Sequence, residues 1–218
     1  VTSLSSTQFG ALQAGQVTAL TTTQAQALGS TQTSGLTSVQ TPSLEGEDLA
    51  QLSSTALRAI GDTPLASVGT TAIKSLSSEQ FGSLTNNQVV ALTTSQAQAL
   101  GSTQTGGLTS SQAGVLQGED LAKLSSTALR EITTSAFANL STSAVQSLSS
   151  AQVSSLKAEQ VIALTTAQAQ ALGTTQAVGL SSTQASSVEG EDLAQVTTTA
   201  LRALTSEAIA QLSTSAVT

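Results

Sequence analysis

The chain has 218 residues but only 9% of them are charged, and it contains three Phe and no His, Cys, Met, Trp or Tyr. Without His and Cys it lacks the common nucleophile–base pairs and the usual ligands of zinc, copper and iron, so we expect no enzymatic activity and no cofactor. The net charge of -7 disfavours a nucleic-acid partner, and the lack of a long apolar run disfavours membrane insertion.

The sequence is an internal repeat with a period of 72 residues. Ser3-Leu4-Ser5-Ser6 returns as Ser75-Leu76-Ser77-Ser78 and again as Ser147-Leu148-Ser149-Ser150. Self-similarity at a fixed period is the sequence signature of a repeat architecture. We therefore predict one continuous array over residues 1–218, with copies at about 3–74, 75–146 and 147–218.

Each copy divides further into nine octads, which are units of eight residues. An aliphatic residue stands at Leu4 and at every eighth position from there to Leu212. In a typical octad such as residues 20–27, this first place is followed by two Ser or Thr, a variable residue, Gln or Ala, and an apolar sixth place. The first and sixth places are the candidate core.

The octad pattern predicts a short helix in each unit, beginning after its second residue. Thr21 and Gln24 have the spacing of a capping box, in which a hydroxyl and an amide satisfy two free backbone groups at a helix start. A continuous helix would turn about 800° in eight residues and so rotate the Leu row around its surface. We therefore predict an all-α solenoid of very short capped helices, one per octad; a β-solenoid is the alternative.

The fifth place changes in order along each copy. It is Gln in the first five octads, Asp in the sixth and mostly Ala in the last three, with Pro64 once. The acidic residues of the sixth octad suggest calcium, because hard cations take carboxylate oxygens. Negative charge at a helix start explains the same residues, and Gln117 replaces Glu45 in the middle copy. The calcium candidates are Glu45, Glu47, Asp48, Glu119, Asp120, Glu189, Glu191 and Asp192.

Three arginines recur with the same period. Arg58, Arg130 and Arg202 each follow the fifth-place Asp of the sixth octad by ten residues. They are candidates for pairing with the acidic octads between repeats or between subunits. Simple solvation of the three side chains is the alternative.

The octads at residues 20–27 and 164–171 show the clearest motif, Leu-Thr-Thr-x-Gln-Ala-Gln-Ala. The chain resembles the Leu-Thr-Thr-x-Gln-x-x-Ala arrays of large secreted proteobacterial proteins, which are often labelled haem-utilisation or adhesion proteins. The resemblance implies an extracellular or cell-surface location and a structural or adhesive role. The haem part of the label has no support, because the chain lacks His, Met, Cys and Tyr as haem ligands.

These features predict a structural extracellular repeat protein that forms a filament, fibre or adhesin stalk through self-association. No distinct capping unit is visible at either end, so we expect a segment of a longer array or a protomer that meets another copy end to end. The alternative is a solenoid binding module for peptide or glycan ligands. The near-identity of the three copies disfavours it, because binding solenoids vary their exposed residues.

Overall fold

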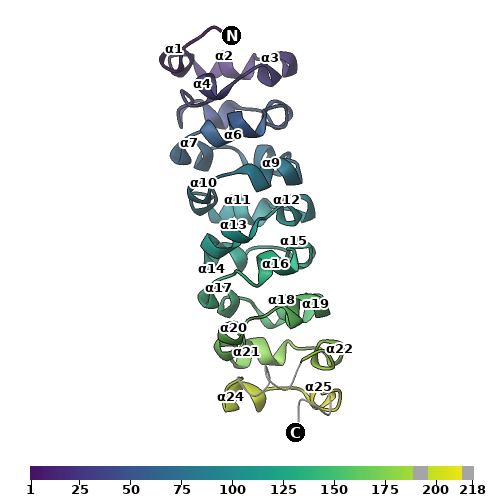
Figure 1. Cartoon of the computed structure of the whole chain (residues 1–218). Helices are drawn as coiled ribbons and strands as arrows, with labels where there is room; N and C mark the ends of the chain where they lie inside the picture. The colour runs from purple at the N-terminus through teal and green to yellow at the C-terminus, as the bar shows by residue number, and fades with distance from the viewer. Residues whose placement is uncertain (189–195, 213–218) are drawn as a thin grey trace. The chain divides into compact units, whose positions relative to one another are not determined.

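The computed structural model describes residues 1–188 and 196–212. The chain forms two compact units, residues 1–108 and residues 109–218. Within each unit, short α-helices follow one another along the chain with brief extended links (Figure 1). The described residues contain no strand, so the all-α prediction is confirmed and the β-solenoid alternative is wrong.

In the octads that the structure describes, each helix is an α-helix of four to six residues, except for the three-residue 3-10 helix η1. In unit 1 they are α1 (Ser6–Gly10), α2 (Ala14–Thr18), α3 (Thr22–Gln26), α4 (Ser30–Thr33), η1 (Thr41–Ser43), α5 (Gly46–Leu49), α6 (Ser54–Ala59), α7 (Asp62–Ala66), α8 (Thr70–Lys74), α9 (Ser78–Ser83), α10 (Asn86–Val90), α11 (Thr94–Ala99) and α12 (Ser102–Gly106). In unit 2 they are α13 (Ser110–Val115), α14 (Gly118–Leu121), α15 (Ser126–Glu131), α16 (Thr134–Phe137), α17 (Thr142–Gln146), α18 (Ser150–Ser155), α19 (Ala158–Ile162), α20 (Thr166–Ala171), α21 (Thr174–Val178), α22 (Ser182–Ala185), α24 (Thr198–Leu201) and α25 (Ser206–Ile209).

The predicted capping box starts many of these helices. At α1 the N-cap Ser5 has an extended backbone (φ -68, ψ 165), and its hydroxyl accepts a hydrogen bond from the backbone N–H of Gln8. Oε1 of Gln8 in turn accepts from the backbone N–H of Ser5 at 2.9 Å. Thr21, Ser77 and Thr85 begin helices in the same way. Each box leaves its helix start with satisfied donors, which offsets part of the cost of so short a helix.

Each helix ends where the backbone becomes extended, before the next helix begins. Leu100 follows α11 with φ -61 and ψ 131, and Gly101 then caps α12 with φ -102 and ψ -177. Helical dihedrals cannot continue through such a pair. The chain therefore changes direction once per octad. These breaks keep the aliphatic row on the inside, whereas an uninterrupted helix would rotate the row around its surface.

The core consists of the first and sixth places of the octads. First-place residues such as Leu52 and Leu76 are 2% and 1% exposed, and sixth-place residues such as Leu57 and Phe137 are fully buried. A helix packs on the helix three octads later: α6 on α9 and α9 on α12 in unit 1, and α15 on α18 and α18 on α21 in unit 2. Three octads thus make about one turn of the solenoid. None of the described helices is long and apolar enough to cross a membrane.

Three glycines mark where consecutive turns approach most closely. A Cβ at Gly35 or Gly107 would lie 2.0 Å from the carbonyl oxygen of Ser6 or Ser78, and one at Gly179 would lie 2.3 Å from that of Ser150. These separations are far inside van der Waals contact. Only glycine fits there, which explains why all three positions, spaced by 72 residues, lack a side chain.

Candidate functional site

The most regular polar feature is a set of glutamine amides between turns, buried except for the half-buried Gln80, which we call the glutamine ladder. Nε2 of Gln88 donates to the backbone carbonyls of Leu57 and Ile60, both at 2.8 Å, while its Oε1 accepts from the N–H of Thr85. Gln88 is fully buried, yet its whole amide is hydrogen-bonded. One side chain therefore caps its own helix and joins it to the preceding turn. The other members with inter-turn bonds are Gln32, Gln40, Gln80, Gln96 and Gln104 in unit 1, and Gln152, Gln160, Gln168, Gln176 and Gln184 in unit 2.

The first turn of unit 1 differs from the ladder. Gln8, Gln16 and Gln24 are exposed, and their Oε1 atoms accept from the N-cap backbone at 2.9, 2.8 and 2.9 Å. Within the described residues, their Nε2 groups have no acceptor. The equivalent glutamines one period later, Gln80, Gln88 and Gln96, all donate to a preceding turn.

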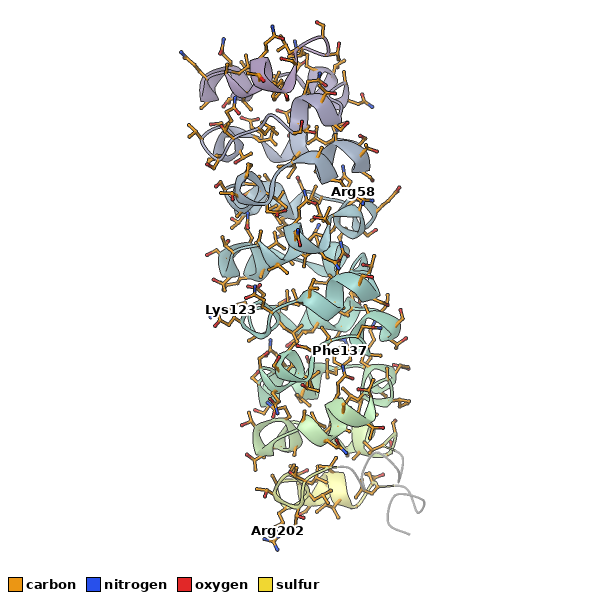
Figure 2. The ribbon with its side chains drawn as sticks, turned by 60° about the vertical axis from the view of Figure 1, so that its left-hand side comes forward. Arg58, Lys123, Phe137 and Arg202 are labelled. Carbon is orange, nitrogen blue, oxygen red and sulfur yellow. The ribbon has the colours of Figure 1, made fainter. Side chains whose placement is uncertain are left out.

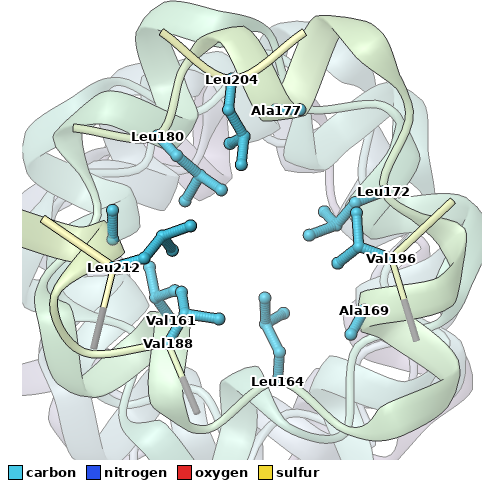
Figure 3. A pocket seen from close by; sticks show the side chains of 11 residues that line it. Val161, Leu164, Ala169, Leu172, Ala177, Leu180, Val188, Val196, Leu204 and Leu212 are labelled. Atoms are coloured by element: carbon cyan, nitrogen blue, oxygen red, sulfur yellow. The ribbon is translucent and has the colours of Figure 1, made fainter. Parts of the chain in front are cut away.

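An apolar pocket lies at the centre of the last turns of unit 2 (Figure 3). Its lining belongs to the first-place and sixth-place rows, such as Leu172 and Ala177, and includes no polar side chain. Leu204 and Leu212 are half-buried, whereas Ile132 and Leu140, one period earlier, are 2% and 4% exposed. A site for a small polar ligand needs a few placed polar groups, which this pocket lacks. It is suited to contact with more aliphatic side chains.

The acidic octads place their charges at helix starts. Glu45 is the N-cap of α5, and Glu47 and Asp48 lie in its first turn, where negative charge complements the helix dipole. Glu45 and Glu47 are exposed, whereas Asp48 is 3% exposed. Burial raises the pKa of the Asp48 carboxyl above its ordinary value, and the charges of Glu45 and Glu47 raise it further.

The second acidic octad repeats this arrangement. Glu119 and Asp120 lie in the first turn of α14, and burial, followed by the charge of Glu119, raises the pKa of the Asp120 carboxyl. In the ranges that the structure describes, no three acidic side chains come together as metal ligands. The remaining calcium candidates, Glu189, Glu191 and Asp192, lie outside the described residues.

The three arginines are on the surface, where Figure 2 shows Arg58 and Arg202 pointing away from the ribbon. Nη1 of Arg130 donates to the carbonyl of Ser155 at 3.3 Å, a bond that reaches the following turn. Among residues 1–188 and 196–212, no arginine pairs with an acidic octad; the ion pair present joins Lys157 to Glu131 at 3.3 Å. Pairing of the arginines between subunits remains a prediction.

Residues 64–94, which run from α7 into α11, match the family model described as the ALTTAQ repeat. This segment is similar to a repeat family. The match covers less than half of the chain, and no curated protein matches it significantly. With the recurring helices and their packing three octads apart, the chain is a repeat protein with a helical solenoid fold.

Sequence reasoning assigned the glutamines to capping and missed their second role between turns. A signal for that role is present in the composition of the fifth place. A capping box accepts Glu as readily as Gln, because it uses only a side-chain oxygen. The fifth place of the first five octads is Gln in all three copies. None of these fifteen positions is Glu. That preference indicates a required N–H donor.

Proposed function

We propose that this chain is a structural repeat protein that self-associates into an extracellular filament, fibre or adhesin stalk and has no catalytic role. The observation that carries this proposal is the glutamine ladder. Gln88 and Gln160 join their turns by the same pair of carbonyl bonds, at 28 and 31 residues' separation. Because the same contact recurs from turn to turn, an array can be lengthened by adding repeats without any new kind of contact. A stalk or fibre needs this property.

Three further observations support a mechanical role. The sequence lacks His and Cys, which serve most often as catalytic bases and nucleophiles. The central pocket of unit 2 has an entirely aliphatic lining, which offers no group to orient a polar substrate. The resemblance to secreted octad arrays supports an extracellular location.

Sedimentation velocity and negative-stain electron microscopy of the purified chain test this proposal. We expect sedimentation to increase with protein concentration and the images to show uniform filaments. A chain that stays monomeric at every concentration and instead binds a peptide or glycan in a ligand screen would contradict self-association and favour a binding module.

A further inference from the structure

Packing between octads three apart sorts the helices of each unit into three columns. In unit 1, α5 packs between α3 and α8, whereas α6, in the next octad, packs between α4 and α9. Consecutive octads therefore belong to different columns. We call the column of α3, α5, α8 and α11 the acidic column, because it contains the acidic octad. The column of α1, α4, α6, α9 and α12 is the arginine column, because it contains Arg58.

The charged side chains on the surface of these two columns are unpaired. The acidic column carries Glu45 and Glu47 at α5 and, one turn later, Lys74 in α8. The arginine column carries Arg58 in α6 and, one turn later, Glu79 in α9. All five side chains are exposed, and Arg58 points away from the ribbon in Figure 2. No ion pair forms within unit 1, all of which the structure describes.

The order of the charges is opposite in the two columns. Glu47 and Glu79 hold the fourth place of their octads, and Arg58 and Lys74 hold the seventh. Residues three apart lie on the same side of a helix, so all four project from the same side of their helices. In chain order, the acidic column is negative and then positive, whereas the arginine column is positive and then negative. Two parallel copies with these columns in contact therefore bring opposite charges together at both turns, whereas antiparallel copies would bring like charges together.

A groove beside Glu47 offers room and acceptors for an arginine side chain. It encloses about 430 Å³ between turns, and no basic side chain lines it. Its polar lining consists of Glu47, Gln51, Thr22, Thr23, Gln26 and Ser75. A guanidinium has five N–H donors and no acceptor, so carboxylate, hydroxyl and amide oxygens together suit it.

Unit 2 separates its charges in the same way. Glu119 lies in α14, which packs on α17, whereas Arg130 lies in α15, which packs on α18. The column of Arg130 continues through α21 to α24, whose C-cap is Arg202. Arg130 and Arg202 are one 72-residue period apart, so this period returns an arginine to the same column. A contact along the side of the solenoid needs that property.

We propose that copies of this chain associate side by side and in parallel, with the arginine column of one copy on the acidic column of the next. Arg58 of one copy pairs with Glu47 of the next, and Glu79 pairs with Lys74. The two surfaces differ, so the contact does not close on itself and further copies can add. The inference rests on the proposed self-association and specifies its surface.

Arg58→Glu tests this surface. It replaces an attractive pair with a repulsive one at an exposed position, so we expect unchanged circular dichroism but an association constant at least about fivefold lower, measured by sedimentation equilibrium on the full chain. The difference from the original chain should shrink at about 1 M salt, where charges are screened within roughly 3 Å.

A matched variant controls for the added charge. Asn86→Asp with Asn87→Asp adds two negative charges, the same change in net charge as Arg58→Glu. Both asparagines are exposed in the first turn of α10, which packs on α7 in the third column. We expect this variant to associate within about twofold of the original chain. Equal losses in the two variants would attribute the effect to net charge and overturn the proposed surface.

A mixing experiment tests whether the two columns meet. Glu47→Lys reverses the charge of the acidic column, so this variant and Arg58→Glu each bring like charges together when alone. In an equimolar mixture, the reversed column of each variant meets a column of opposite charge on the other. We expect the mixture to recover the association of the original chain.

A mixture that associates as weakly as its components would overturn the proposed surface. Undiminished association of Arg58→Glu would place the contact elsewhere and leave self-association standing. An original chain that stays monomeric at every concentration would contradict the proposed function as well.

Discussion

Gln88 and Ala56 hold the same place in their octads, yet neighbouring turns are held together differently around them. Gln88 donates to two carbonyls of the preceding turn. The side chain of Ala56 has no polar group, although its backbone carbonyl accepts from Oγ1 of Thr33 at 2.8 Å. The next residue, Leu57, is fully buried, as are Leu65 and Ile73 in the following two octads. Turns are therefore joined by side-chain amide bonds at the ladder glutamines and mainly by aliphatic burial at the octads whose fifth place is Ala.

The difference separates what gives stability from what gives register. Burying an aliphatic side chain contributes about 1.5–3 kcal/mol, which is at least as much as a hydrogen bond, but it is not directional. The two bonds of Gln88 are satisfied in one alignment of the turns only, because the carbonyls of Leu57 and Ile60 are fixed by their own helix end. The glutamine octads thus determine how turns are aligned, and the alanine octads add apolar area.

Gln88→Glu should have the largest effect of the changes considered. The variant carboxylate would be buried against two carbonyl oxygens with no donor to offer, so we expect unit 1 to lose about 3–5 kcal/mol of its free energy of unfolding at neutral pH. Gln8→Glu, in an exposed octad with the same cap, should change it by less than about 0.5 kcal/mol. Urea unfolding followed by circular dichroism measures both, and equal effects would remove the ladder from the explanation of stability.

Gly107→Ala should have the next largest effect, because it disturbs the alignment that Gln104 holds in the same octad. The new methyl group would collide with the carbonyl oxygen of Ser78, so we expect a loss of about 2–3 kcal/mol. Gly15→Ala, in α2 with no atom within 4 Å of the added carbon, should instead stabilise the chain by about 0.5–1 kcal/mol. Thermal unfolding of the two variants gives the comparison, and a neutral Gly107→Ala would contradict the close approach of the turns.

Asp48→Asn and Asp120→Asn test the octad between the glutamine and alanine regions. The pKa of each carboxyl is raised on folding, chiefly by burial, so the folded state holds its proton more tightly than the unfolded state. The contribution of these two carboxyls to the free energy of unfolding is therefore greatest below the ordinary carboxyl pKa. It falls as the pH rises through the raised pKa of the folded state. We expect the Asn variants to be more stable than the original at neutral pH by less than about 1 kcal/mol, and the gain to vanish in acid. Unfolding curves across this pH range decide, and a loss at neutral pH would show that the carboxylates are needed.

Glu131→Gln should have the smallest effect. The ion pair of Glu131 with Lys157 joins side chains that are 46% and 39% exposed, so water and salt screen it. We expect a change below about 0.5 kcal/mol, and a smaller difference between the variant and the original chain at high salt. A larger loss would mean that surface charge, and not only the amide and apolar contacts, aligns the turns.

Much of this fold follows from short stretches of sequence. The capping box at Thr21 and Gln24 spans four residues, and the aliphatic row beginning at Leu4 needs only its spacing to reveal a core. The placement of Glu47 and Asp48 in a first helical turn follows from the same octad register. The inter-turn hydrogen bonds of the glutamine ladder were not predicted, although the consistent use of Gln instead of Glu at the fifth place indicated a required N–H donor.

Apart from η1, which begins late in its octad at Thr41, the sequence by itself determined where the described helices start and stop and which residues face inward. Caps and extended breaks act between residues that are neighbours in the chain. Only the tertiary structure decided that about three octads complete a turn, that Gln88 meets carbonyls 28 and 31 residues earlier, and that Gly107 must leave room for Ser78. Those contacts depend on the change of direction at each extended link, summed over three helices. No pattern within one octad encodes the total change of direction over three helices. The packing of the aliphatic rows fixes it.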